Sequence, residues 1–182
     1  MNKMEVIIME ALIIVDLQND FAKPDGALYF PGAENVIPPI VKLVEDFKAR
    51  NLPIIYTRDW HEDNDYEFGI WGVHCLHDTK GSEIVDELKE ALKGYENAFE
   101  IRKSRYSAFY GTNLEELLKR LDVTKVHVGG LVTHICVLFT VEELRNRAIE
   151  TIIHSRCVDS FDKDMHNFAL REMKEVLLAH IV

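Results

Sequence analysis

The chain has 182 residues, of which 47% are hydrophobic and 29% are charged. These values are typical of a single globular domain with a full hydrophobic core. The formal net charge of −10 argues against nucleic acid and against an anionic membrane surface as partners. Three cysteines without disulfide-framework spacing favour a reducing compartment, so we expect a cytoplasmic protein.

The apolar N-terminal stretch is predicted to be an extended lead-in followed by a strand. Glu5 and Glu10 interrupt its apolar residues, and it has no small-residue cleavage site. A signal peptide or a membrane span is therefore not expected. Met4 and Met9 are alternative start sites that the sequence does not distinguish.

Short apolar runs alternate with helical patterns along the rest of the chain. In chain order we predict strand 11–15, helix 33–50, strand 52–57, helix 82–92, strand 98–101, helix 112–121, strand 126–131, helix 135–144, strand 151–154, helix 164–177 and strand 178–182. Ser82 and Thr112 are candidate N-caps, the latter with Glu115 as a capping-box partner.

This alternation predicts an α/β fold with a doubly wound, mainly parallel six-stranded sheet and helices on both faces. Ligands in such sheets bind outside the carboxyl ends of the strands. The sequence has neither a dinucleotide-binding glycine motif nor a P-loop, so no nucleotide cofactor is expected.

Polar residues stand at the predicted carboxyl ends of four strands. They are Asp16, Asp59, Lys103 and Cys136. We expect Cys136 in the first turn of a helix, where the helix terminus would lower the thiol pKa. Its position alone also fits a small buried hydrophobe. As a nucleophile, Cys136 would give its proton to Asp16, with Lys103 beside both groups.

A second polar cluster follows the strand at 52–57. Asp59 and His61 are two residues apart, and in an extended segment their side chains point the same way. His74 follows across a loop, and Glu67 lies between them. These carboxylate and imidazole groups suit zinc, with manganese or iron as alternatives. Ordinary loop polarity is the other interpretation, and Cys75, His77 and Asp78 are further donors nearby.

Five segments resemble the nicotinamidase/isochorismatase-like cysteine hydrolase family, in the family's order and over nearly the whole chain. They are LIIVDLQNDF (12–21), TRDWH (57–61), WGVHC (71–75), KSRYSAF (103–109) and GLVTHICV (130–137). The resemblance implies one Rossmann-like, isochorismatase-like hydrolase domain over residues 1–182.

The resemblance also implies a set of functional residues. It implies the catalytic triad Asp16, Lys103 and Cys136, the metal ligands Asp59, His61 and His74 with Glu67 as an additional ligand, and the ring-binding aromatics Phe21, Trp71 and Tyr106. It further implies a cis peptide between Leu131 and Val132, with the N–H groups of Val132 and Cys136 directed at an oxyanion.

The implied activity is metal-assisted hydrolysis of nicotinamide to nicotinate and ammonia through a thioester on Cys136. A small amide is the expected substrate, and a homo-oligomer is expected. His134 and the KSRYSAF segment are closer to isochorismatase-type members of the family. Isochorismatase-type and carbamoyl or ureido amide hydrolases are therefore alternatives. A non-catalytic metal- or partner-binding domain is the alternative outside this enzyme class.

Overall fold

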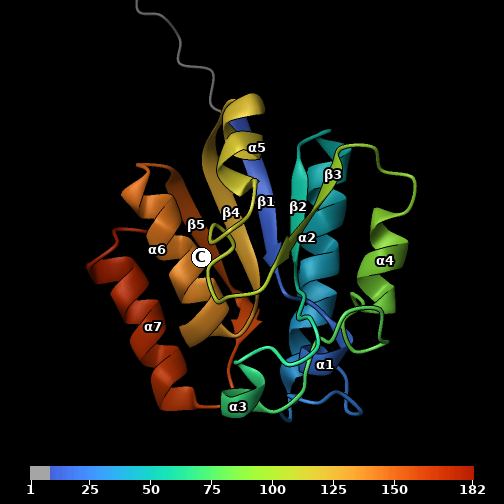
Figure 1. The fold of residues 1–182 in the computed structure, drawn as a ribbon. Coiled ribbons are helices and arrows are strands. Elements are labelled where there is room, and N and C mark those ends of the chain that lie inside the picture. The colour runs from blue at the N-terminus through green and yellow to red at the C-terminus, as the bar shows by residue number, and fades with distance from the viewer. Residues whose placement is uncertain (1–8) are drawn as a thin grey trace, which may run out of the picture.

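The computed structural model describes residues 9–182 and contains one six-stranded sheet (Figure 1). The strands are β1 (Met9–Val15), β2 (Ile54–Asp59), β3 (Ala98–Lys103), β4 (Val123–Leu131), β5 (Glu150–Asp159) and β6 (His180–Ile181). All neighbouring pairs are parallel, in the order β3-β2-β1-β4-β5-β6. The predicted fold class is confirmed. The extended lead-in predicted before β1 lies outside the described residues.

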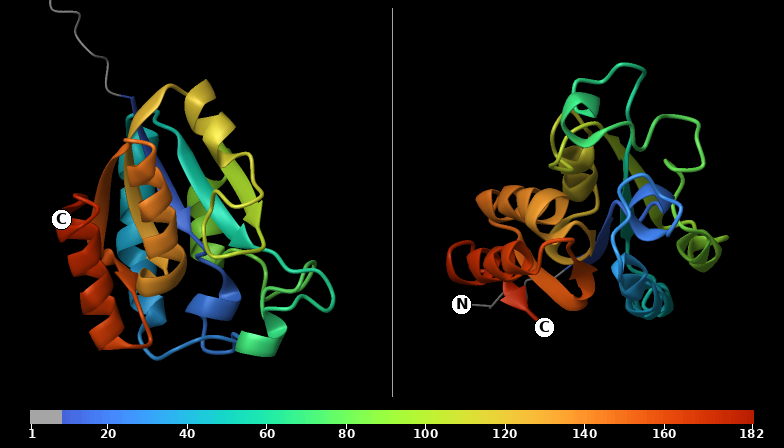
Figure 2. Two further views of the ribbon diagram at one scale, coloured as in Figure 1. Left: turned by 60° about the vertical axis from the view of Figure 1, so that its left-hand side comes forward. Right: turned by 90° about the horizontal axis from the view of Figure 1, so that it is seen from below.

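Helices cover both faces of the sheet. They are α1 (Asn19–Ala22), α2 (Ile37–Ala49), α3 (Phe68–Trp71), α4 (Asp86–Leu92), α5 (Leu114–Arg120), α6 (Leu138–Asn146) and α7 (Lys163–Glu175). The helices α2 and α4 lie on one face, and α5, α6 and α7 lie on the other (Figure 2). None of the described helices is long and apolar enough to cross a bilayer.

Strand β1 runs through the centre of the molecule and contributes to both hydrophobic cores. Leu12 and Ile14 pack toward α2, whereas Ala11, Ile13 and Val15 pack toward α5, α6 and α7. All five side chains are fully buried. This explains why β1 is a continuous apolar run, because a central parallel strand is covered on both faces.

Several element boundaries differ from the sequence prediction. The helix predicted from residue 33 begins as a 3₁₀ turn (Ala33–Val36), and β5 extends five residues beyond the predicted end at 154. Helix α4 begins at Asp86, so Ser82 is not its N-cap. The capping box at α5 is also wrong. The Thr112 hydroxyl accepts from the N–H of Leu114, whereas Glu115 forms ion pairs with Lys119 and Arg147.

The topological switch point of the sheet lies between β1 and β4, where the order in which successive strands are added reverses. Strands β2 and β3 continue from β1 toward one edge, and β5 and β6 continue from β4 toward the other. The register places Gly130 beside Val15 at the carboxyl end of this pair. A side chain at Gly130, whose φ is +126°, would overlap the carbonyl oxygen of Val15. The close approach of β1 and β4 therefore depends on glycine at this position.

We expect Gly130→Ala to lower the free energy of unfolding by more than about 2 kcal/mol, because the new methyl group forces the two central strands apart. Thermal or denaturant unfolding measures the change. Gly69→Ala is the matched control, because a Cβ there meets no atom within 4 Å. Equal stability of the two variants would contradict the role of Gly130.

Candidate active site

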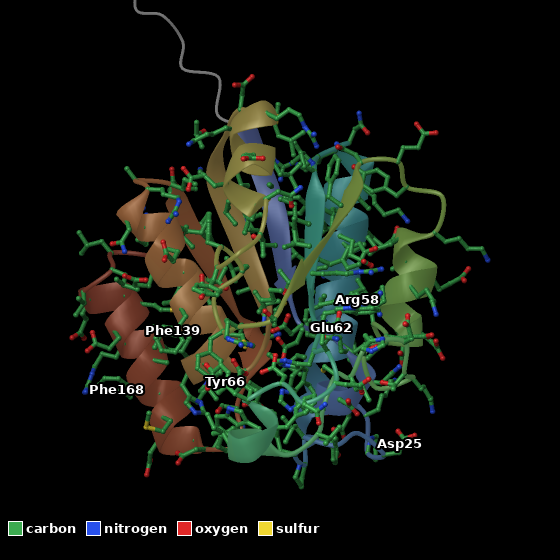
Figure 3. The ribbon with its side chains drawn as sticks, in the orientation of Figure 1. Asp25, Arg58, Glu62, Tyr66, Phe139 and Phe168 are labelled. Atoms are coloured by element: carbon green, nitrogen blue, oxygen red, sulfur yellow. The ribbon has the colours of Figure 1, made fainter. Side chains whose placement is uncertain are left out.

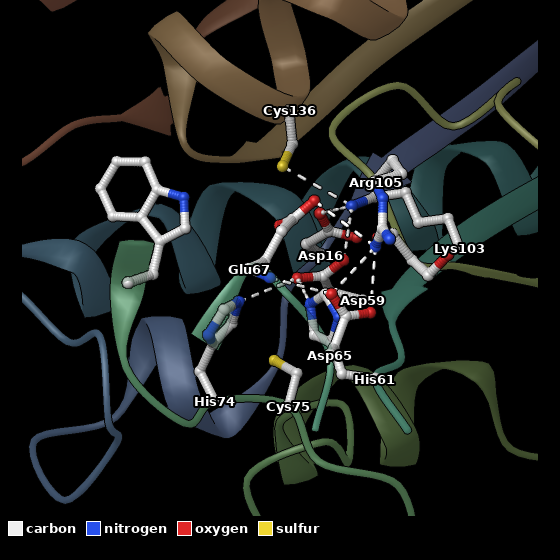
Figure 4. Close-up of polar contacts among 12 residues, drawn as sticks. Asp16, Asp59, His61, Asp65, Glu67, His74, Cys75, Lys103, Arg105 and Cys136 are labelled. Carbon is white, nitrogen blue, oxygen red and sulfur yellow. Dashed lines mark hydrogen bonds and ion pairs between the residues drawn. The ribbon is translucent and has the colours of Figure 1, made fainter. Parts of the chain in front are cut away.

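The four polar residues predicted at strand ends lie together at one edge of the sheet. Lys103 is the last residue of β3, Asp59 the last of β2, Asp16 follows β1, and Cys136 follows β4. Their strands are neighbours in the same order, β3-β2-β1-β4. Parallel pairing therefore brings residues that are up to 120 positions apart to one site (Figure 4).

The Lys103 ammonium is the centre of this site. Its Nζ lies 2.7 Å from Asp16 Oδ2 and 3.0 Å from Asp59 Oδ1, and it donates to Cys136 Sγ at 3.6 Å. The Asp16 carboxylate is fixed from its other side by Thr57. The Thr57 hydroxyl donates to Asp16 Oδ1 at 2.5 Å and accepts from the Asp16 backbone N–H at 3.0 Å. All these side chains are buried.

Burial and neighbouring charges shift the pKa values of Lys103, Asp16 and Asp59 in opposite directions. Burial would lower the pKa of Lys103, but the Asp16 and Asp59 carboxylates raise it well above its usual value, so the ammonium stays charged. Burial raises the pKa of Asp16, although Lys103 opposes this shift. The pKa of Asp59 is held well below its usual range by Lys103 and by hydrogen bonds from two imidazoles, despite the opposing effect of burial.

The local structure around Cys136 differs from the prediction. Residues Thr133–Val137 form a π-helical turn, and α6 begins only at Leu138, so Cys136 precedes the α-helix. Burial raises the pKa of the Cys136 thiol well above its usual value, which Lys103 only partly offsets. The expected lowering of this pKa by a helix terminus is therefore wrong. The buried thiol depends on a nearby base such as Asp16 to lose its proton.

The predicted metal ligands lie together beside Lys103. One ligand atom each from Asp59, His61 and His74 lies within 4.8 Å of the others, and all three residues are buried. Asp59 Oδ2 is 2.9 Å from His61 Nε2 and 3.4 Å from His74 Nε2. One carboxylate and two imidazoles form a donor set that can hold a divalent metal ion.

Neighbouring carboxylates also fit a cation at this position. Glu67 is 1% exposed, and its Oε1 accepts no hydrogen bond within residues 9–182, although the Arg105 guanidinium lies 3.6 Å from it. It is not part of the compact group of three, so its role as a ligand stays a prediction. Asp65 Oδ2 lies 3.0 Å from His61 Nδ1 and pairs with Arg105, which fixes the imidazole in the manner of an outer-shell carboxylate. Asp65 is not among the site residues predicted from the sequence.

A cavity of about 320 Å³ opens beside the polar cluster and Cys136. The three predicted ring-binding aromatics, Phe21, Trp71 and Tyr106, all line it, and Trp71 Nε1 donates to the Tyr106 hydroxyl at 3.1 Å. Other lining residues are not among those predicted from the sequence. These are Ala27, Leu28, Tyr29, Phe30, Ile135 and Phe161. Their segments carry no local motif that separates a cavity wall from an ordinary loop.

The peptide bond between Leu131 and Val132 is cis, as the resemblance implied. Both residues line the cavity next to Cys136. Leu131 is the last residue of β4, and Val132 connects it to the π-helical turn that carries the thiol.

A family model described as "Isochorismatase domain" matches residues 10–181. The chain belongs to the isochorismatase family. It is therefore a hydrolase, and its predicted family membership is confirmed.

Solved structures of this family resemble the whole chain. The nicotinamidase/pyrazinamidase PncA from Bacillus subtilis is 32% identical, with a TM-score of 0.91 over 96% of this chain and 100% of that one. The pyrazinamidase of Pyrococcus horikoshii, solved in complex with zinc, is 33% identical, with a TM-score of 0.86 over 95% and 98%. The N-carbamoylsarcosine amidase from Thermoplasma acidophilum is 30% identical, with a TM-score of 0.83 over 96% and 95%.

We expect the purified protein to bind about one divalent metal ion per chain and Asp59→Ala to lose it, because Asp59 supplies the only carboxylate in the compact donor group. Elemental analysis after dialysis measures the metal content. Asp63→Ala is the control, because Asp63 is exposed four residues away. Full metal retention by Asp59→Ala would show that the ion binds elsewhere.

We expect Lys103→Met to lower the free energy of unfolding of chelator-treated protein by about 3–5 kcal/mol at neutral pH, because two buried carboxylates lose their shared cation. Without Lys103 the folded-state pKa values of Asp16 and Asp59 rise, so protonation at lower pH relieves the loss. Unfolding curves at pH 7 and pH 5 measure the difference from wild type. The difference in unfolding free energy between wild type and Lys103→Met should be smaller at pH 5 than at pH 7. An equal difference at both pH values would show that the uncompensated carboxylates are not the cause. Lys89→Met, at an exposed ion pair, is the control.

Proposed function

We propose that the protein is a nicotinamidase, which hydrolyses nicotinamide to nicotinate and ammonia. The observation that carries this proposal is the character of the cavity beside Cys136. Its walls are largely aromatic and aliphatic, and no Lys or Arg of residues 9–182 lines it. A neutral aromatic amide fits such walls, and its carboxamide supplies the bond to be broken.

The cavity favours nicotinamide over the substrates of the other family branches. Isochorismate carries two carboxylates and N-carbamoylsarcosine carries one. Among residues 9–182 the cavity is lined by the carboxylates of Asp59 and Glu67 but by no lysine or arginine that could pair with such a substrate. A substrate carboxylate is recognised most strongly by a cationic side chain that donates to it, and a neutral amide does not need one. His134, which resembles isochorismatase-type members, does not line the cavity and instead bonds to Ser160.

The reaction begins with transfer of the Cys136 thiol proton to Asp16, whose pKa is raised by burial. The sulfur attacks the carboxamide carbon, and the oxygen takes the negative charge. The N–H groups of Val132 and Cys136 are the proposed donors to this oxyanion. Lys103 keeps the site electrically balanced while the proton is on Asp16, because its ammonium contacts both the carboxylate and the sulfur.

The C–N bond breaks as Asp16 returns the proton to the leaving nitrogen, which departs as ammonia. Cys136 is left as a thioester of nicotinic acid. Asp16 then takes a proton from water, the resulting hydroxide attacks the thioester carbon, and the C–S bond breaks. Nicotinic acid leaves and ionises to nicotinate, and its proton passes to ammonia or to solvent. The proton on Asp16 returns to the sulfur, so the enzyme is restored.

Asp59, His61 and His74, with Glu67 as a predicted fourth ligand, would hold the metal ion, which when bound supplies a Lewis acid that anchors the ring nitrogen. We propose zinc because the donor set suits it and because the Pyrococcus relative was solved with zinc. Phe21, Trp71 and Tyr106 are the proposed contacts to the ring.

We expect purified protein to release ammonia from nicotinamide and Cys136→Ala to lower kcat by at least about a thousandfold, because the thioester cannot form. Chelation should also lower the rate, and added zinc should restore it. Cys157→Ala is the matched control, because this buried thiol does not line the cavity. Turnover of N-carbamoylsarcosine or isochorismate without turnover of nicotinamide would overturn the proposal.

A further inference from the structure

Phe161 stands at the mouth of the cavity, between β5 and α7. Its side chain lines the cavity, yet the residue is 51% exposed. The reacting end is different, since Cys136 is 8% exposed and Asp59 is 4% exposed. The cavity therefore has a closed polar end and an open end, and Phe161 lines the cavity at the open end while remaining half-exposed to solvent.

Other aromatic rings surround Phe161. Its ring centroid lies 6.4 Å from that of Trp71 and 6.2 Å from that of Phe30, and both pairs have edge-to-face geometry. The His134 imidazole packs edge-on against it at 5.0 Å. These partners come from the segments after β2, β1 and β4, so Phe161 joins loops from different strands into one wall.

The backbone on each side of Phe161 is fixed. Ser160 is fully buried, and its hydroxyl lies 2.6 Å from Nδ1 of His134, in the turn that carries Cys136. Asp162 is the N-cap of α7, and its carboxylate accepts from the N–H groups of Asp164 and Met165. Phe161 is thus held in place although its ring is half-exposed.

On the basis of the function proposed above, the orientation of the substrate ring indicates which ring atom faces Phe161. Suppose that the nicotinamide ring directs its nitrogen, N1, toward Asp59 and its carboxamide, on C3, toward Cys136. The two anchored ring atoms, N1 and C3, then lie on either side of C2. The ring carbon opposite is C5, which must point away from the closed end toward the mouth. We propose that Phe161 covers C5 of the substrate and thereby excludes rings that carry a substituent there.

Substitution of Phe161 should change specificity more than folding, because the side chain is half-exposed. We expect wild type to favour nicotinamide over 5-methylnicotinamide in kcat/KM, and Phe161→Ala to reduce this preference about tenfold or more. Phe161→Leu should be intermediate. Phe168→Ala, which removes an exposed ring on the flank of α7 outside the cavity, is the matched control (Figure 3).

A binding measurement separates this inference from the proposed function. Calorimetry gives the dissociation constants of both amides for Cys136→Ala, with and without Phe161→Ala, and the ratio should shift in the same direction as kcat/KM. If nicotinamide is hydrolysed but neither ratio changes, the role of Phe161 is wrong and the nicotinamidase proposal stands. If nicotinamide binds without turnover, the nicotinamidase proposal fails while the binding ratio still decides the role of Phe161. If it neither binds nor reacts, both fail.

Discussion

The buried ammonium of Lys103 is the interaction on which the site depends. Two buried carboxylates, Asp16 and Asp59, stand at the ends of neighbouring strands, and both lie within 3.0 Å of the Lys103 ammonium. Uncompensated, two such charges would oppose folding by several kcal/mol each. Lys103 compensates both and also contacts the Cys136 sulfur, so one cation links the proposed nucleophile to the proposed metal ligands.

The two carboxylates respond differently to the same cation. Asp59 lies 2.9 Å and 3.4 Å from the imidazoles of His61 and His74, which with Lys103 keep its pKa low. Asp16 is fully buried and is bonded to Thr57, and burial raises its pKa. Asp59 is therefore suited to hold a metal ion and Asp16 to exchange a proton. The raised pKa of the Cys136 thiol fits this division, because the sulfur then becomes nucleophilic only when Asp16 accepts its proton.

Much of this arrangement was predictable from the sequence, because the spacing of apolar residues and the position of turn-forming residues indicate where buried strands and helices begin and end. The alternation of apolar runs and helical patterns gave the sheet, and polar residues at strand ends gave Asp16, Asp59, Lys103 and Cys136. The π-helical turn at Cys136 was not predictable, since its apolar spacing matches an α-helix locally. Asp65 and Phe161 were missed because their roles arise from tertiary contacts with His61 and Trp71 rather than from any local pattern.

The reacting groups and the cavity walls have different origins in the fold. Asp16, Asp59 and Lys103 are fixed by the register of paired strands, whereas Phe30, Trp71, Tyr106 and Phe161 come from separate connections after β1, β2, β3 and β5. A change in one connection alters one side of the cavity and leaves the strand pairing intact. The same bond-breaking apparatus can therefore acquire new substrates during divergence, or in the laboratory, through the exchange of single loops.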